Sequence, residues 1–198
     1  MKTLTKLKIF FIIAATSLVL SLLAFYYYKS ESGQIIKEKH EFLDAVTNIK
    51  LEQIVKWRTE RISDAEFFPT IGKIIKSTAE LKANKNNKDA KQYFSSALKR
   101  FKDNGYFENV FITDVKGSIL FSLDSSFNTI DQLRIEEIKY AVEKDSVIFG
   151  DFYFSQTNKT IHFNVVSIIK DNSGIPIGGY VQIVDPYKSL YPIIQSWP

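Results

Sequence analysis

The chain opens with one long run of apolar residues. Residues 9–28 contain no charged side chain. In a helix, about twenty such residues span the roughly 30 Å hydrocarbon layer of a bilayer. The run therefore predicts a transmembrane helix at residues 9–28, preceded by a short segment at residues 1–8.

A cleaved signal peptide is the alternative interpretation of this run. Signal peptides have a shorter apolar core and small residues at the cleavage site, whereas this run ends in Tyr26–Tyr28 and Lys29. An uncleaved anchor is therefore favoured. Because Lys2, Lys6 and Lys8 precede the run, the positive-inside rule predicts a cytoplasmic N-terminus. We expect a single-pass protein of the cell (inner) membrane, with its domain on the extracytoplasmic side.

Helical spacing of apolar residues continues after the anchor. Residues 30–68 contain no proline, and their apolar positions recur every three or four residues until Pro69 ends the pattern. This predicts a long stalk helix. Two shorter helices are expected at residues 70–82 and 89–102, because a polar segment at residues 83–88 separates them.

The second half of the chain has the pattern of strands. Strands are predicted at residues 107–113, 118–123, 149–155, 160–169 and 177–184, with a helix at 131–143 between the second and third. Asp131 is the expected N-cap of that helix. Asp114–Gly117 and Asp171–Gly174 are expected turns. The order predicts an α+β domain over residues 30–186, a five-stranded antiparallel sheet flanked by helices, followed by a linker at residues 187–198.

Charge and composition exclude several classes of function. The net charge is +4, from 26 basic and 22 acidic residues, and four lysines around the anchor account for the whole excess. The domain is therefore neutral, and nucleic-acid binding, which needs a basic patch, is not expected. The chain has no cysteine and two histidines, so Cys-ligated and multi-histidine metal sites are excluded. Since no nucleophile or phosphate-binding motif is present either, no enzyme activity, cofactor or metal is expected.

Three segments resemble the Cache family, the extracytoplasmic PAS-like domains of bacterial and archaeal receptors. They are LEQIVKWRTER at residues 51–61 on the long helix, NVFITDVKGSILFS at 109–122 and GGYVQIVDP at 178–186. The resemblance, over roughly residues 30–190, implies the ligand-sensing region of a sensor histidine kinase or chemoreceptor, dimeric through its long helix. The tail at 187–198 resembles the entry to the membrane-proximal module of a double-Cache sensor. A longer receptor carrying an output domain is therefore expected.

A ligand pocket is expected on one face of the sheet, because side chains alternate between faces along a strand. Along residues 160–169, Phe163 and Val165 should pack on the long helix, while His162 and Asn164 face the other way. By the same alternation, Tyr180 and Gln182 share a face of the last strand. The residues expected to bind a small ligand are Tyr153, Ser155, His162, Asn164 and Gln182.

The alternative is that these five side chains are ordinary polar residues facing solvent. Amino-acid-sensing members of the family carry an Arg-x-Trp-Tyr pattern before the third strand, but residues 140–150 contain neither Arg nor Trp. This departure leaves the ligand class open. A second hypothesis is therefore kept, in which the chain is a membrane-anchored interaction or structural protein of the cell envelope without a small-molecule ligand.

Overall fold

The computed structural model describes residues 2–103, 107–125, 130–155 and 159–196. The chain divides into two units, residues 1–51 and residues 52–198. The last two residues of the expected linker lie outside the described residues.

The first unit consists of one helix. Helix α1 is Lys2–Phe67 and contains both predicted helices, at 9–28 and 30–68, except for Phe68 at the end of the second. Its apolar segment has a mean hydropathy of 2.1 over the most apolar window, and none of that window is buried. Large apolar side chains such as Phe10, Leu20 and Phe25 are exposed there. By length and composition, this helix can cross a membrane.

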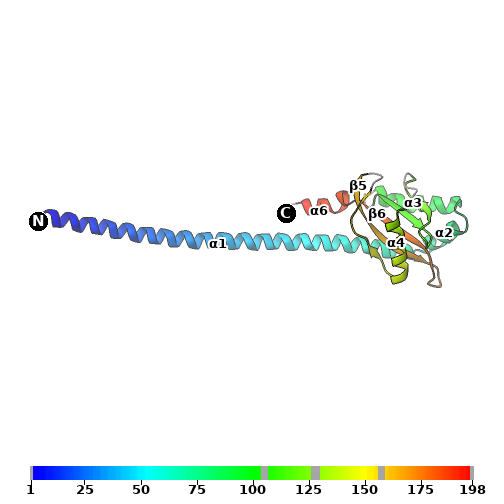
Figure 1. Cartoon of the computed structure of the whole chain (residues 1–198), viewed down its shortest axis with the longest axis horizontal. Helices are drawn as coiled ribbons and strands as arrows, with labels where there is room; N and C mark the ends of the chain where they lie inside the picture. Colours follow the sequence, from blue (N-terminus) through cyan, green and yellow to red (C-terminus); the bar gives the residue numbers. More distant parts are fainter. Residues whose placement is uncertain (1, 104–106, 126–129, 156–158, 197–198) are drawn as a thin grey trace. The chain divides into compact units, whose positions relative to one another are not determined.

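The second unit contains the sheet and the remaining helices (Figure 1). After α1, its elements are a short 3₁₀ helix η1 (Phe68–Thr70), α2 (Gly72–Ala83), α3 (Lys88–Asp103), β1 (Asn109–Thr113), β2 (Ile119–Ser122), α4 (Gln132–Lys144), β3 (Ile148–Phe149), β4 (Tyr153–Ser155), β5 (Thr160–Lys170), β6 (Pro176–Val184), α5 (Pro186–Ser189) and α6 (Tyr191–Gln195). The α+β class agrees with the sequence prediction, and so does the order of helices and strands as far as β6, apart from the region of β3 and β4; α5 and α6 lie largely in the segment predicted as a linker.

The sheet is antiparallel, with strand order β2-β1-β6-β5-β3, and β4 also pairs with β5. The single strand predicted at 149–155 is two short strands. Ile148 and Phe149 pair with Val166 and Val165 of β5, and Tyr153–Ser155 pair farther along the same strand. Between them, residues 150–152 are not part of either strand.

Each face of the sheet carries its own apolar core. On the face that we call the helix side, Trp57 of α1 and residues of α2 and α3 pack against Phe163 and Val165 of β5. The Trp57 and Phe163 rings meet edge to face, with centroids 5.4 Å apart. On the opposite face, which we call the α4 side, Ile138 of α4 packs against Val166. The predicted alternation along β5 is confirmed.

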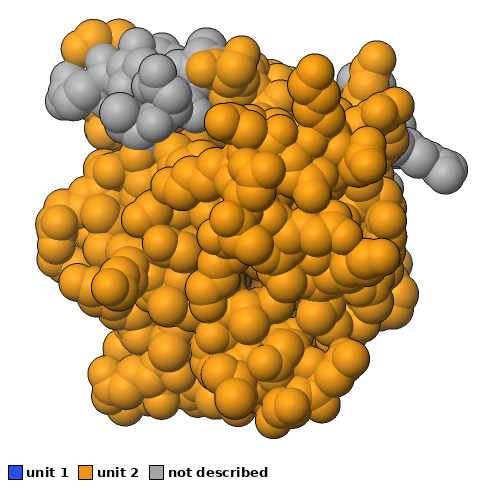
Figure 2. All heavy atoms as spheres, turned by 90° about the vertical axis from the view of Figure 1, so that its right-hand side faces the viewer, with its two compact units in different colours: residues 1–51 blue, residues 52–198 orange. Residues whose placement is uncertain are grey.

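Two tight turns, each containing one glycine, connect neighbouring strands of the sheet. Gly117 and Gly174 adopt positive φ angles of 90° and 80°, in the turns predicted at their positions. In both turns an aspartate side chain, Asp114 or Asp171, accepts backbone N–H groups. Figure 2 shows one face of the second unit as space-filling spheres.

Candidate functional site

A group of polar side chains is buried on the α4 side of the sheet. It consists of Arg134 and Glu137 from α4, Tyr153 from β4 and Asn164 from β5, and we call it the Arg134 cluster. Arg134 is 7% exposed and Asn164 is completely buried. Buried polar groups of this kind are costly unless each finds a partner.

Helix α4 carries two members of the cluster on its inner face. Its buried residues are Arg134, Glu137, Ile138 and Ala141. These positions are three, four and seven residues apart, which places them along one stripe of a helix. The helix begins where the Asp131 side chain accepts a hydrogen bond from the Arg134 backbone N–H. The predicted N-cap is confirmed.

Asn164 joins the other three side chains. Its amide nitrogen donates to Glu137 Oε2 at 2.8 Å. Its amide oxygen accepts from the Tyr153 hydroxyl at 3.2 Å and from Arg134 Nε at 3.4 Å. One asparagine thus links a carboxyl group to two donors, and both ends of its amide are in use.

The Arg134 guanidinium also contacts Asp131 and Tyr153. Its Nη1 donates to Asp131 Oδ2 at 2.8 Å, and its Nη2 contacts the Tyr153 hydroxyl. The guanidinium carbon also lies 4.8 Å from the centre of the Tyr153 ring, a cation–π distance. Arg134 is therefore preorganised, because the surrounding groups determine where its charge lies.

Burial changes the acid–base properties of two cluster members. Desolvation raises the pKa of Glu137, although the Asn164 hydrogen bond and the Arg134 charge act against it. Desolvation also raises the pKa of Tyr153 to about 12. The tyrosine is therefore a neutral hydroxyl near pH 7, able to donate a hydrogen bond.

Gly150 allows Glu137 to reach the sheet. A Cβ atom at this position would overlap Glu137 Oε1 and lie 3.4 Å from the Asn164 carbonyl oxygen. The Gly150 backbone N–H donates to that carbonyl at 2.8 Å. The glycine that separates β3 from β4 therefore also makes room for the buried carboxyl group.

The structure brings four of the five predicted site residues to this side of the sheet. Tyr153 and Asn164 are cluster members. The His162 ring lies 5.8 Å from the Tyr153 ring, and its Nε2 contacts Glu108 and lies 3.2 Å from Thr160 Oγ1. Ser155 lies at the far end of β4, opposite Thr160.

Gln182 does not belong to this group, and its predicted placement beside Asn164 is wrong. In the β5–β6 register, Asn164 pairs with Ile183, whereas Gln182 pairs with Val165. Gln182 therefore lies on the helix side, where its amide nitrogen donates to the Tyr180 hydroxyl at 3.0 Å. Alternation relates residues within a strand, but only the register between strands determines which face each set occupies.

Sequence reasoning missed Arg134 and Glu137. Both lie on a helix, whereas the alternation that predicts the other site residues applies only to strands. A signal was nevertheless present, because Arg134 and Glu137 fall on the same helical stripe as the apolar residues Ile138 and Ala141. Charged residues on the apolar stripe of a helix indicate a buried polar site.

The arrangement suits the binding of a small polar molecule. A guanidinium, a neutral hydroxyl, an amide and a carboxyl group converge next to an apolar core. Within the described residues, no cluster of His, Cys, Asp and Glu side chains could hold a metal ion.

No protein-family model and no curated protein sequence matches the chain. Several solved structures, in contrast, have a similar fold. The V. cholerae histidine kinase DctB sensor domain superposes with a TM-score of 0.55 at 11% identity, over 74% of this chain and 57% of that one. The ligand-binding domain of the Campylobacter jejuni chemoreceptor Tlp3, in complex with L-norvaline, gives 0.55 at 13% identity, over 80% and 64%.

A third similar structure is the ligand-binding domain of the Pseudomonas aeruginosa amino acid chemoreceptor PctC, in complex with GABA. Its TM-score is 0.53 at 12% identity, over 79% of this chain and 68% of that one. The chain thus spans 57% to 68% of these three solved chains. At such identities the likeness concerns the fold alone, and the chain shares its fold with these Cache-type sensor domains.

Proposed function

We propose that the chain is the ligand-sensing region of a transmembrane signal-transduction receptor of the histidine kinase or chemoreceptor type. The observation that supports this most strongly is the buried Arg134 cluster. An apolar core would stabilise the α4 side at least as well as buried charged groups do. A preorganised guanidinium with convergent polar partners is better explained by a ligand that it recognises.

The proposed ligand is a small polar molecule with an anionic group. The Arg134 guanidinium, the Tyr153 hydroxyl and the Asn164 amide would bind that group, since Arg matches carboxylate geometry. The Tlp3 and PctC domains were solved with L-norvaline and GABA, which both carry a carboxylate. Ser155 and His162, on the same side of the sheet, would border the site.

The proposed membrane arrangement follows from the first unit. Residues 9–28 cross the cell membrane, and the lysines before them keep the N-terminus cytoplasmic, so the second unit is extracytoplasmic. Between the anchor and residue 52, α1 exposes Ile35, Phe42 and Ile49, which are seven residues apart. That spacing supports a homodimer through this helix. Sensing rather than catalysis is the role of the chain.

The experiment is a ligand screen on the full chain in lipid nanodiscs. A molecule that binds only the folded state raises the melting temperature by mass action. We expect at least one small carboxylate to do so, and Asn164→Ala to abolish the shift. Asn86→Ala, at an exposed loop position, is the matched control and should keep it.

Two results would contradict the proposal. A ligand-induced shift that survives Asn164→Ala would place the ligand elsewhere. The other result is that no molecule in a broad screen shifts the melting temperature while one protein copurifies with the chain. The chain would then be better described as a membrane-anchored interaction protein of the cell envelope.

A further inference from the structure

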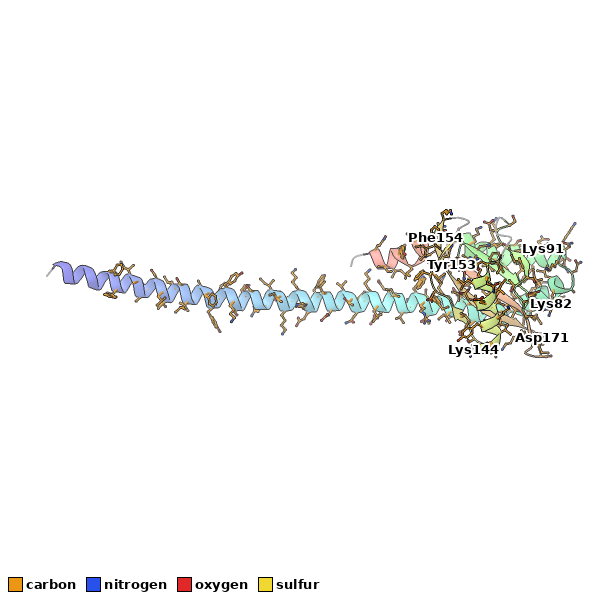
Figure 3. All side chains as sticks on the ribbon, in the orientation of Figure 1. Lys82, Lys91, Lys144, Tyr153, Phe154 and Asp171 are labelled. Carbon is orange, nitrogen blue, oxygen red and sulfur yellow. The ribbon has the colours of Figure 1, made fainter. Side chains whose placement is uncertain are left out.

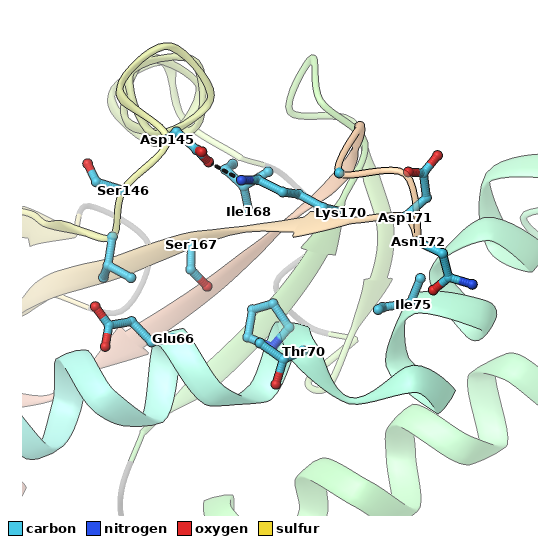
Figure 4. Close-up of a pocket in the computed structure, with 13 residues that line it drawn as sticks. Glu66, Thr70, Ile75, Asp145, Ser146, Ser167, Ile168, Lys170, Asp171 and Asn172 are labelled. Carbon is cyan, nitrogen blue, oxygen red and sulfur yellow. Dashed lines mark ion pairs between the residues drawn. The ribbon is translucent and has the colours of Figure 1, made fainter.

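A cavity lies towards the C-terminal end of β5, away from the Arg134 cluster. It has a volume of about 520 Å³ and shares no lining residue with that cluster. Its walls come from the end of α1, the connection between α4 and β3, and the turn between β5 and β6 (Figure 4). Tyr153 and Asp171, one residue from each site, lie well apart in Figure 3.

The cavity exists because β3 is short. Pairing between β3 and β5 is limited to Ile148–Val166 and Phe149–Val165. Before β3, Asp145 ends helix α4 in the left-handed conformation, with a φ of 51°, and the chain turns away from β5. The stretch of β5 from Ser167 onward therefore borders open space instead of β3.

Ser167 is a buried polar residue in the wall of this cavity. It is 4% exposed, and its hydroxyl has no hydrogen-bond partner in the described part of the chain. A buried hydroxyl without a partner is destabilising, because it has lost its hydrogen bonds to water and gained none in the protein. In Figure 4 the hydroxyl points towards the end of α1, where Glu66 lies. This geometry suits a ligand group that brings its own hydrogen-bond donor.

The charge of the lining is negative. Asp145 and Lys170 form an ion pair across the cavity mouth and offset each other. Glu66 and Asp171 also line the cavity, and among the described residues neither has a basic partner. The Asp171 Oδ1 atom accepts two backbone N–H groups of its own turn, from Ser173 and Ile175. Two carboxylates therefore favour a cationic occupant.

The two carboxylates lie at opposite ends of the cavity. Figure 4 shows Glu66 on one side and Asp171 on the other, with Ser167 between them and the apolar Ile75 nearer Asp171. Pro69 and Val147 add to the apolar part of the wall. An occupant that matches this pattern has a positive charge at each end and an aliphatic middle.

We propose that this cavity binds a linear aliphatic diamine. One ammonium group lies between Glu66 and the Ser167 hydroxyl, which accepts its hydrogen bond. The other lies at Asp171, and the methylene chain covers the apolar wall. The cavity is a site additional to the Arg134 cluster, so the proposal does not depend on that cluster binding a ligand.

The test is isothermal titration calorimetry of the full chain in nanodiscs of zwitterionic lipid, with diaminobutane as the probe. Butylamine and butanediol have the same carbon chain but carry one charge and none. We expect saturable binding of the diamine, and binding of the monoamine weaker by roughly tenfold or more, since it leaves one carboxylate without a partner. The diol should not bind.

Two isosteric variants locate the site. Glu66→Gln and Asp171→Asn should each weaken diamine binding by about three- to tenfold, the range for partly exposed ion pairs. Asp171→Asn keeps the oxygen that accepts from the turn, so folding is preserved. Asp114→Asn is its matched control, because Asp114 accepts the same two hydrogen bonds in the β1–β2 turn. Glu52→Gln, at an exposed position of α1, is the control for Glu66.

Three results would overturn the proposal. One is the absence of diamine binding at millimolar concentration. Another is unchanged affinity in both Glu66→Gln and Asp171→Asn. The third is equal affinity for butylamine, since a one-charge ligand needs only one end of the cavity. A separate titration with Asn164→Ala should leave diamine binding intact, which keeps this outcome distinct from that of the ligand screen.

Discussion

Asn164→Asp tests whether the Arg134 cluster is held together as the structure describes. The substitution changes one atom. It replaces the amide nitrogen, which donates to Glu137 Oε2 at 2.8 Å, by a second carboxylate oxygen. The oxygen that accepts from Tyr153 and Arg134 is retained. Only the contact with Glu137 becomes repulsive.

The size of the effect can be bounded. Two full charges at 2.8 Å repel by about 6 kcal/mol at an effective dielectric constant of about 20. Protonation of the Glu137 carboxylate removes that repulsion. From the ordinary Glu pKa of 4.5 to pH 7, protonation costs about 3 kcal/mol. Because burial already raises the pKa of Glu137, we expect Asn164→Asp to lose about 2–3 kcal/mol of stability at pH 7.

The assay is urea denaturation of the full chain in detergent micelles, followed by near-ultraviolet circular dichroism. At pH 5 the cost of protonation falls, so the loss should shrink below about 1 kcal/mol. Adding Glu137→Gln restores a donor opposite the new carboxylate, and the double variant should regain at least about 1 kcal/mol. The reasoning fails if Asn164→Asp is as stable as the wild type at pH 7, or if the double variant is no more stable than the single.

Further predictions concern the sheet, the buried acid and the aromatic core. Gly178→Ala would place a Cβ atom 2.5 Å from the Thr113 carbonyl oxygen, and denaturation should show a loss of about 2 kcal/mol. Gly72→Ala, with open space around it, should show none. Because the pKa of Glu137 is raised, stability falls as the pH rises above 4.5, and Glu137→Gln should flatten a plot of stability against pH. Phe163→Ala removes a fully buried ring and should cost about 3–5 kcal/mol by the same urea assay.

Local chemistry determines the features of this fold that the sequence predicts. Gly117 and Gly174 adopt the positive φ angles that their turns need, and Asp131 caps α4, because these roles depend on the residue and its immediate neighbours. The order of helices and strands follows from apolar spacing for the same reason.

The candidate site is harder to predict, because it depends on contacts between distant segments. Arg134 and Asn164 are thirty residues apart and meet only when α4 packs on the sheet. Gln182 shows the same limit, since its face is set by pairing with Val165. The need for a glycine at position 150 is a further example, because a side chain there would overlap the Glu137 carboxyl group of α4.

Strand β5 places two different environments on consecutive residues. Phe163 touches Trp57 of α1 on one face, and Asn164 holds Arg134 and Glu137 on the other. A single peptide unit, stiff because its bond cannot rotate freely, joins the two. A molecule that drew Asn164 towards α4 would therefore also displace Phe163. The contact between Phe163 and Trp57 would be the first contact on the helix side to change.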